Sequence, residues 1–318
     1  MSNETNTQNR QNTTSSTNGN ESGKKTETAP LSDILKGFDF EQWKAARAER
    51  RAKLKDEYCA KYGLKTMTES ELSALDEAEF RLKECAGCGH VYCNKAVNKF
   101  QRPLITVQGG QLKIETVLCD VWYRECLPEQ CRKAGIPDKY AARTFDDYEI
   151  TADNGRAVKL AHWFLDDNRD KWLYYYGGAG TGKTFLASLI ARQYVTRSKG
   201  VVFGDVPMLL SELKRTFNDP AKSTEGLLDR YCQCTLLVMD DIGAGQTTEW
   251  NVGIVYQIIN ARYNNELPTI ITSNYDLDNL GRRLSSSGDT YSAQRIVSRL
   301  SQMCVLGFLG TVDRRRQK

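Results

Sequence analysis

Apolar residues in the second half of the chain fall into short continuous runs, separated by longer stretches in which they recur at helical spacing. The runs lie at 172–176, 201–203, 236–239 and 268–274, and runs of this length are typical of strands buried on both faces. After the first run, an amphipathic helix is indicated by the spacing of Leu186, Leu189, Ile190 and Tyr194. The alternation predicts an α/β fold, a parallel sheet of about five strands in three α/β/α layers.

The first half of the chain has a different pattern. Residues 1–30 are mostly Asn, Thr, Ser, Gln and Glu, too polar to offset the entropy of ordering, so we expect a disordered tail there. Charged, helix-favouring residues predict helices over 41–62 and 69–83. In the first of these, Trp43 is an apolar anchor that either covers a neighbouring domain or meets a partner protein. Apolar stretches on both sides of two glycines predict a β-hairpin over 104–118.

A phosphate-binding pattern lies between the strand at 172–176 and the helix that follows it. The segment reads Gly-Gly-Ala-Gly-Thr-Gly-Lys-Thr and fits G-x-x-x-x-G-K-[ST]. We expect a nucleoside triphosphate to be bound by Gly177, Gly178, Ala179, Gly180, Thr181, Gly182, Lys183 and Thr184. The glycines let backbone N–H groups face the phosphate oxygens, Lys183 adds a positive charge, and the Thr184 hydroxyl is a ligand for Mg²⁺. A glycine-rich surface turn is the alternative, which the flanking strand and helix disfavour.

Two carboxylates end a later buried strand. Asp240 and Asp241 follow the apolar run at 236–239, and parallel strands deliver such side chains to the carboxyl edge of the sheet. We expect Asp240 to hold Mg²⁺ through water and Asp241 to orient or deprotonate the attacking water.

Three further polar side chains are candidates for the same reaction. Asn274 ends the run at 268–274, where it contacts the attacking water or the γ-phosphate, caps the next helix, or does both. Arg295 and Arg299 lie four residues apart on one predicted helix face, with no carboxylate at helical spacing to pair with them. They fit the γ-phosphate of a neighbouring subunit; a solvated basic face is the alternative.

Four other residues have weaker interpretations. Phe145 and Tyr148 precede the phosphate loop and either flank the nucleotide base or belong to the core. Lys214 and Arg215, on a predicted helix over 206–217, are candidates for contact with a DNA backbone, although basic residues on a helix are usually only solvated.

A cysteine-rich segment precedes the second domain. Cys85-x₂-Cys88-Gly has the shape of a zinc knuckle, and with the hairpin and the later cysteines it resembles a zinc ribbon. The expected Zn²⁺ ligands are Cys85, Cys88, Cys119 and Cys126, with Cys93, Cys131 and His90 as substitutes. Reduced structural cysteines without metal are the alternative.

Composition sets the class of protein. The chain has 318 residues, 40% of them hydrophobic and 26% charged, and no apolar stretch long enough to cross a bilayer. Ten cysteines without an export signal predict a reducing, cytoplasmic location. The net charge of +4 permits contact with nucleic acid without arguing for it. We expect a tail over 1–30, a helical and zinc-binding domain over 31–135, and an ATPase domain over 136–318.

From Arg143 to the C-terminus the order of motifs resembles the DnaC/DnaI-type helicase loaders and the related IstB-like transposition ATPases, a clade of AAA+ proteins. The resemblance rests on the phosphate loop, on Met239-Asp240-Asp241-Ile-Gly243, on Ile258-Ile-Asn-Ala-Arg-Tyr263, on Thr272-Ser-Asn274 and on Arg295-Ile-Val-Ser-Arg299. It implies an AAA+ domain without the C-terminal helical lid, with Asp240 and Asp241 as Walker B, Asn274 as sensor 1, Arg299 as the arginine finger, Arg295 as its support and Arg314 as sensor 2.

The resemblance also implies a function. An ATPase would load a replicative hexameric DNA helicase, docking on it through the amino-terminal domain, holding single-stranded DNA on the ATPase domain, and self-associating through the ATP site. Three other interpretations remain open. They are an ATPase that regulates a transposase on duplex DNA, a helicase-binding adaptor whose nucleotide is structural, and a DNA-binding zinc protein with an ancillary ATPase.

Overall fold

The structure is a computed structural model that describes residues 39–88, 93, 99–166, 171–198, 200–217 and 223–316. The predicted tail over 1–30 and the substitute ligand His90 lie outside these residues. The described part divides into two units, one up to Thr68 and one from Glu69 onward. Within the described residues, no helix combines the length and apolar character that a membrane span requires.

The first unit contains the long helix α2 (Phe40–Tyr62), close to the helix predicted over 41–62. It begins where the Asp39 carboxylate accepts hydrogen bonds from the backbone N–H groups of Glu41 and Gln42. It ends at Gly63, whose φ of 67° suits glycine. The Trp43 side chain is 42% exposed, and the Arg47 guanidinium lies over its ring.

The second unit begins with a helix and the predicted hairpin. Helix α3 (Glu69–Gly87) is followed by strands β1 (Gln101–Gln108) and β2 (Gln111–Leu118), which pair antiparallel with Gln108 opposite Gln111. The turn residues Gly109 and Gly110 both have positive φ, as a tight hairpin turn requires. Short helices follow: α4 (Asp120–Glu125), α5 (Leu127–Ala134), α6 (Asp138–Ala141) and the 3₁₀ turn η1 (Phe145–Asp147).

The remaining elements form the predicted α/β fold. In chain order they are α7 (Gly155–Leu165), β3 (Trp172–Tyr176), α8 (Lys183–Arg197), β4 (Val201–Asp205), α9 (Val206–Thr216), α10 (Thr224–Gln233), β5 (Leu236–Asp240), α11 (Glu249–Asn264), β6 (Thr269–Ser273), α12 (Leu277–Ser285), α13 (Thr290–Met303), β7 (Cys304–Phe308) and η2 (Arg314–Arg316). The five strands are parallel and lie in the order β4-β5-β6-β3-β7, which confirms the predicted five-stranded parallel sheet.

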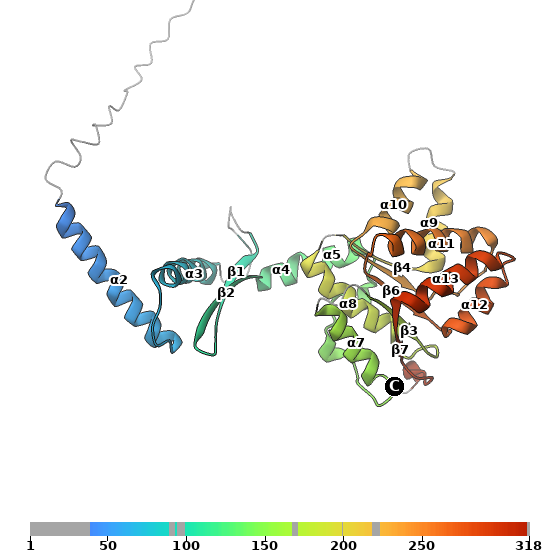
Figure 1. The fold of residues 1–318 in the computed structure, drawn as a ribbon, viewed down its shortest axis with the longest axis horizontal. Coiled ribbons are helices and arrows are strands. Elements are labelled where there is room, and N and C mark those ends of the chain that lie inside the picture. Colours follow the sequence, from blue (N-terminus) through green and yellow to red (C-terminus); the bar gives the residue numbers. More distant parts are fainter. Residues whose placement is uncertain are drawn as a thin grey trace, which may run out of the picture. The chain divides into compact units, whose positions relative to one another are not determined.

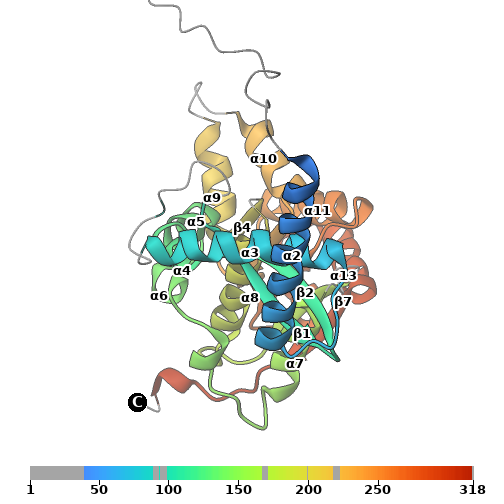
Figure 2. The ribbon, with the colours of Figure 1, turned by 90° about the vertical axis from the view of Figure 1, so that its left-hand side faces the viewer.

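Two apolar clusters cover the two faces of this sheet, because successive side chains of a strand point to opposite sides. Leu173 and Tyr175 of β3 pack with α5, α7 and α8, whereas Trp172 and Tyr174 pack with α9 to α13. Figure 1 shows these two layers of helices with the strands between them. Helices α9 and α10 stand side by side (Figure 1 and Figure 2).

The topology gathers polar side chains at one edge of the sheet. Because β3, β5 and β6 are adjacent and parallel, their carboxyl ends lie together. The phosphate loop follows β3, Asp240 ends β5, and Asn274 follows β6. The sheet order therefore brings three segments that are distant in sequence into one site.

Candidate active site

The predicted phosphate loop connects β3 to the start of α8. Gly177, Gly180 and Gly182 have φ values of 146°, 76° and 97°, which only glycine adopts readily. A Cβ on Gly178 would lie 2.6 Å from the Thr311 carbonyl oxygen, so a side chain there would collide with the C-terminal segment. The loop thus needs its glycines both for its curvature and for close backbone packing.

Lys183 reaches back over this loop. Its Nζ donates hydrogen bonds to the carbonyl oxygens of Gly177 (3.0 Å) and Gly178 (2.7 Å) and to Asn274 Oδ1 (2.9 Å). Burial lowers the pKa of Lys183, which the negative charges of Asp241 and Asp240 partly counteract. The structure therefore places a cation at the phosphate loop, in the position that the motif predicts.

Thr184 and Asp240 face each other directly. The Thr184 hydroxyl donates to Asp240, at 3.0 Å from each carboxylate oxygen, and the Thr272 hydroxyl donates to Asp240 Oδ1 at 2.6 Å. Burial raises the pKa of Asp240, and the two hydroxyl hydrogen bonds oppose that rise. A hydroxyl and a carboxylate at this spacing are oxygen ligands of the kind that Mg²⁺ binds.

Asp241 and Asn274 form the adjoining pair. Asn274 Nδ2 donates to Asp241 Oδ1 at 2.8 Å, while the Asp241 backbone N–H donates to the Thr272 hydroxyl. Asp241 has a positive φ of 54°, and burial raises the pKa of its carboxyl group. Asn274 does not cap the next helix, because Asp276 caps α12; the capping interpretation of Asn274 was wrong.

Thr272 is a residue of the site that the sequence did not single out for a role. Its hydroxyl donates to Asp240 and accepts from the Asp241 backbone, so it fixes both carboxylates. It lies on β6, the strand next to β5. A threonine inside an apolar strand is common, and only the sheet order reveals that this one faces the aspartates.

The C-terminal segment packs on the phosphate loop. The Gly178 N–H donates to the Gly310 carbonyl, and the Arg314 N–H donates to the Gly180 carbonyl. The Arg314 side chain donates to the Glu149 carbonyl (2.9 Å) and the Thr151 hydroxyl (3.0 Å). The positive charge of the neighbouring Arg315 lowers the pKa of Lys183. The sequence missed Arg315, because nothing in a run of three arginines distinguishes one from another.

Four other residues that the sequence suggested for the site make most of their contacts elsewhere. Arg295 and Arg299 lie on α13, and their hydrogen bonds and ring contacts are with α11 and α13. Tyr148 is 5% exposed and belongs to the core cluster, and Phe145 packs against that cluster. The core interpretation of these two aromatic residues is therefore confirmed, although the Tyr148 hydroxyl also donates to the Gly182 carbonyl at 3.4 Å.

The cysteines do not form a metal-binding group among the described residues, where no cluster of three or more Cys, His, Asp or Glu side chains is suited to a metal ion. Cys85 lies inside α3, and the Cys88 thiol donates to its carbonyl oxygen. Cys119 precedes α4, and Cys126 follows it. Cys131 is fully buried in the core cluster around α8, so its surroundings are those of a structural residue.

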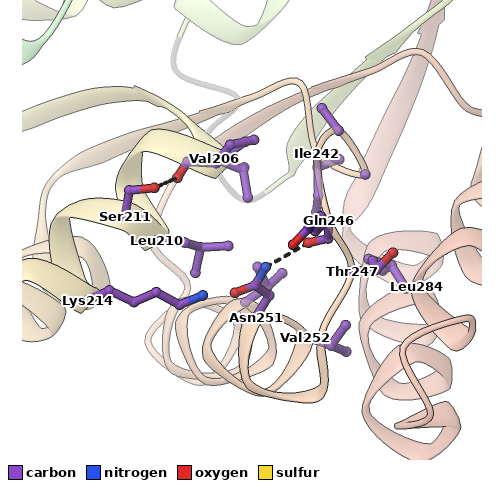
Figure 3. Close-up of a pocket in the computed structure, with 14 residues that line it drawn as sticks. Val206, Leu210, Ser211, Lys214, Ile242, Gln246, Thr247, Asn251, Val252 and Leu284 are labelled. Carbon is purple, nitrogen blue, oxygen red and sulfur yellow. Dashed lines mark hydrogen bonds between the residues drawn. The ribbon is translucent and has the colours of Figure 1, made fainter.

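A pocket of about 260 Å³ lies between α9, the loop that follows Asp241 and α11. Residues of α9, of the loop after Asp241 and of the first turns of α11 line it, including Lys214 and Asn251 (Figure 3). Lys214 Nζ lies 4.6 Å from the Trp250 ring centroid, and the Phe217 ring meets the same indole edge-on at 5.7 Å. Phe217 is 56% exposed. We call Lys214, Phe217 and Trp250 the α9 aromatic cluster.

Comparison with known proteins gives one family match. The profile of the family described as "IstB-like ATP binding protein" matches residues 124–318. The replicative helicase loader DnaI of Bacillus subtilis (strain 168) is 27% identical over 235 residues, 70% of this chain and 74% of DnaI. The replicative helicase loader DnaC of Escherichia coli (strain K12) is 26% identical over 155 residues, 48% of this chain and 63% of DnaC.

Two solved structures are also similar. A crystal structure of DnaI shares 26% identity at a TM-score of 0.48, over 54% of this chain and 93% of that one. A crystal structure of the DnaC helicase loader shares 28% identity at a TM-score of 0.45, over 54% of this chain and 99% of that one.

Proposed function

The chain belongs to the family of IstB-like ATP binding proteins, and from this premise we propose that it is a cytoplasmic AAA+ ATPase that loads a replicative DNA helicase. The observation that carries the proposal is the convergence of Lys183, Thr184, Asp240, Asp241 and Asn274 at one edge of the sheet. Similarity to DnaI and DnaC, both named as replicative helicase loaders, supplies the class of partner.

Each residue of this group has a role in hydrolysis. The phosphate loop and Lys183 would bind the triphosphate of ATP, and Thr184 and Asp240 would hold Mg²⁺, which neutralises charge on the β- and γ-phosphates. Asp241, whose pKa is raised by burial, is suited to orient or deprotonate a water molecule. Asn274 binds both Lys183 and Asp241, so it would align the attacking water with the γ-phosphate.

Arg299 would complete the site from another subunit. Its contacts within its own chain are with α11 and α13 rather than with the phosphate loop, which supports insertion into a neighbouring site. An arginine finger contributes about 10³ to 10⁵ in rate, so hydrolysis would be slow until subunits assemble. Arg295 would support the finger, and Arg314 would serve as sensor 2.

The α9 aromatic cluster is the proposed contact for single-stranded DNA. Exposed aromatic rings stack on unpaired bases, and nearby cations contact the phosphates. Phe217 offers an exposed ring beside the partly buried Trp250, and Lys214 and the adjacent Arg215 offer cations at the end of α9. Lys214 of this cluster also lines the pocket in Figure 3, together with residues of the loop after Asp241, so DNA bound at Lys214 would lie near the segment that follows the proposed catalytic carboxylate.

The amino-terminal domain over 31–135 is the proposed docking element for the helicase, with Trp43 as an exposed anchor.

We propose a zinc-ribbon-like site in this domain, with Cys85, Cys88, Cys119 and Cys126 as ligands of Zn²⁺. Cys119 and Cys126 flank the short helix α4, which supports part of this set. Metal analysis of the purified protein tests it, with Cys131→Ser as the control variant that keeps every proposed ligand.

The loader proposal is tested by mixing the full chain with hexameric replicative helicases in the presence of ATP, ADP or no nucleotide. We expect a complex whose stability depends on the nucleotide and which Lys183→Ala weakens. A complex with a transposase and duplex DNA instead would favour the transposition function. Helicase loading that survives Lys183→Ala would favour the adaptor function.

A further inference from the structure

The guanidinium group of Arg299 is held by side chains of a neighbouring helix. Its Nη2 donates a hydrogen bond of 2.6 Å to Asn260 Oδ1. Its central carbon lies 5.2 Å from the ring centroid of Tyr256 and 5.3 Å from that of Tyr263. Tyr256, Asn260 and Tyr263 recur at helical spacing and so share one face of α11. We call these three residues the arginine seat.

The seat is itself fixed against α13. The Tyr263 hydroxyl donates to Gln302 Oε1 at 3.0 Å, and Gln302 lies on the same helix as Arg299. Arg295 lies over the other end of the seat, with its guanidinium 5.2 Å from the Tyr256 ring. Each arginine of the pair therefore contacts Tyr256, and each of the two helices constrains the seat.

The hydrogen bonding of Arg299 is incomplete within the described part of the chain. Its buried Nε has no hydrogen-bond partner there, and Nη1 reaches only the Arg295 carbonyl at 3.5 Å. No carboxylate of the described residues forms an ion pair with it. A buried donor without a partner is unfavourable for folding. This arrangement orients the guanidinium and leaves its positive charge uncompensated.

We propose that Asn260, together with Tyr256 and Tyr263, positions Arg299 for insertion into the nucleotide site of a neighbouring subunit. The inference rests on the proposed function, in which Arg299 acts on another subunit's γ-phosphate. A flexible arginine loses rotamer freedom when it meets a phosphate. In this protein the free subunit already restricts the side chain, which reduces that loss at the moment of reaction. The Asn260 carbonyl and the ring faces orient the cation and leave its charge in place.

A mixture of two variants isolates the positioning role. Asp241→Asn subunits lack the proposed base and keep Arg299, whereas Arg299→Ala subunits keep the base and lack the finger. We expect neither variant alone to hydrolyse ATP efficiently, and we expect the mixture with Mg²⁺ to recover activity because one subunit supplies Arg299 to the other. Tight ATP binding by both variants, measured by calorimetry, confirms that their sites are folded.

Asn260→Leu is then introduced into one member of the mixture at a time. Leucine has nearly the same size without the acceptor oxygen. In the Asp241→Asn subunit it should lower hydrolysis by about 10- to 100-fold, the effect of misplacing a catalytic group. In the Arg299→Ala subunit it should leave the rate of the mixture unchanged, because that subunit has no finger to position. Asn260→Asp in the Asp241→Asn subunit keeps an acceptor but sets a carboxylate against the guanidinium, so it should also lower hydrolysis, because the charge of Arg299 is then compensated.

The possible results separate the proposals. An equal loss in both subunits would show that Asn260 only stabilises the fold, and no loss in either would show that it does not position Arg299; both outcomes overturn the inference. A parent mixture that recovers no activity, although both variants bind ATP, would instead reject the action of Arg299 on a neighbouring site, and the seat's role with it.

Discussion

Asn274 donates a hydrogen bond of 2.8 Å from its amide nitrogen to Asp241 Oδ1. The same amide accepts from Lys183 Nζ through its oxygen, so one side chain connects the proposed phosphate-binding cation to the proposed catalytic carboxylate. Because an amide has a donor and an acceptor at fixed spacing, Asn274 can hydrogen-bond both partners only when they stand at the matching distance from each other. This link gives the sensor 1 assignment a physical basis.

Asn274→Ala is expected to slow ATP hydrolysis much more than it weakens ATP binding. Lys183 keeps its contacts with the loop carbonyls, whereas Asp241 loses the donor that orients it, and misorientation of a catalytic group costs about 10- to 100-fold in rate. Steady-state hydrolysis and calorimetric titration with ATP measure the two effects. Asn265→Ala, at the exposed end of α11, is the control. A parallel loss of binding and rate would reject the alignment role.

Gly178→Ala is expected to prevent nucleotide binding and to lower the melting temperature. The added methyl group would lie 2.6 Å from the Thr311 carbonyl oxygen and 3.0 Å from the Thr311 Cα, and these are backbone atoms that cannot rotate away. Gly253→Ala provides a matched control within α11, because a Cβ there meets nothing within 4 Å and alanine favours the helix by about 1 kcal/mol. The melting temperature should fall for Gly178→Ala and rise for Gly253→Ala. An unchanged melting temperature in Gly178→Ala would show that the C-terminal segment does not pack on the loop.

The sequence predicted the carboxyl-edge site because the positions of the strands along the chain and the loop motif are both encoded locally. Short apolar runs locate β3, β4, β5 and β6, and the polar residues of the site lie at or directly after the ends of β3, β5 and β6. The roles of Thr272 and Asn260 could not be predicted in this way, because each depends on which strand or helix lies alongside, and a single sequence does not state that. Strand β7 was not predicted either, because Gly307 interrupts its apolar residues. A glycine is needed there because a Cβ added at this position would lie 2.7 Å from the Tyr175 ring.

Asp240→Asn is expected to stabilise the protein in the absence of nucleotide and Mg²⁺. Burial raises the pKa of Asp240 above 3.8, so the folded state holds the proton more tightly than the unfolded state. As pH rises from 3.8 through the raised pKa, the free energy of unfolding therefore falls, and at neutral pH the buried charge is destabilising. Asparagine keeps an acceptor for the Thr272 hydroxyl without the charge. A gain of about 1 kcal/mol would raise the melting temperature by about 2–4 °C.

The pH dependence distinguishes this effect from a general one. The stabilisation by Asp240→Asn should shrink as the pH is lowered toward the ordinary pKa of an aspartate, because the wild-type carboxyl group then becomes neutral as well. Asp289 is the control of opposite sign: hydrogen bonds from Ser292 lower the pKa of its carboxyl group, so Asp289→Asn should give no stabilisation at neutral pH. Thermal unfolding in a chelator at several pH values measures both. A constant gain at every pH would contradict the explanation.

Trp250→Ala is expected to weaken the binding of single-stranded DNA while leaving ATP binding intact. The substitution removes the partly buried ring that Lys214 and the exposed Phe217 contact, and losing a stacked aromatic ring costs about 1–3 kcal/mol per base. Lys214→Ala should act differently: it should reduce the dependence of affinity on salt by about 0.7 in the logarithmic slope, the contribution of one phosphate contact on a single strand. Met208→Ala removes an apolar side chain from the same helix that is 70% exposed, and it should change neither quantity. Fluorescence anisotropy with a labelled oligonucleotide over a range of salt concentrations separates the contribution of stacking from that of charge. Wild-type affinity in both the Trp250 and Lys214 variants would show that single-stranded DNA does not bind at the α9 aromatic cluster.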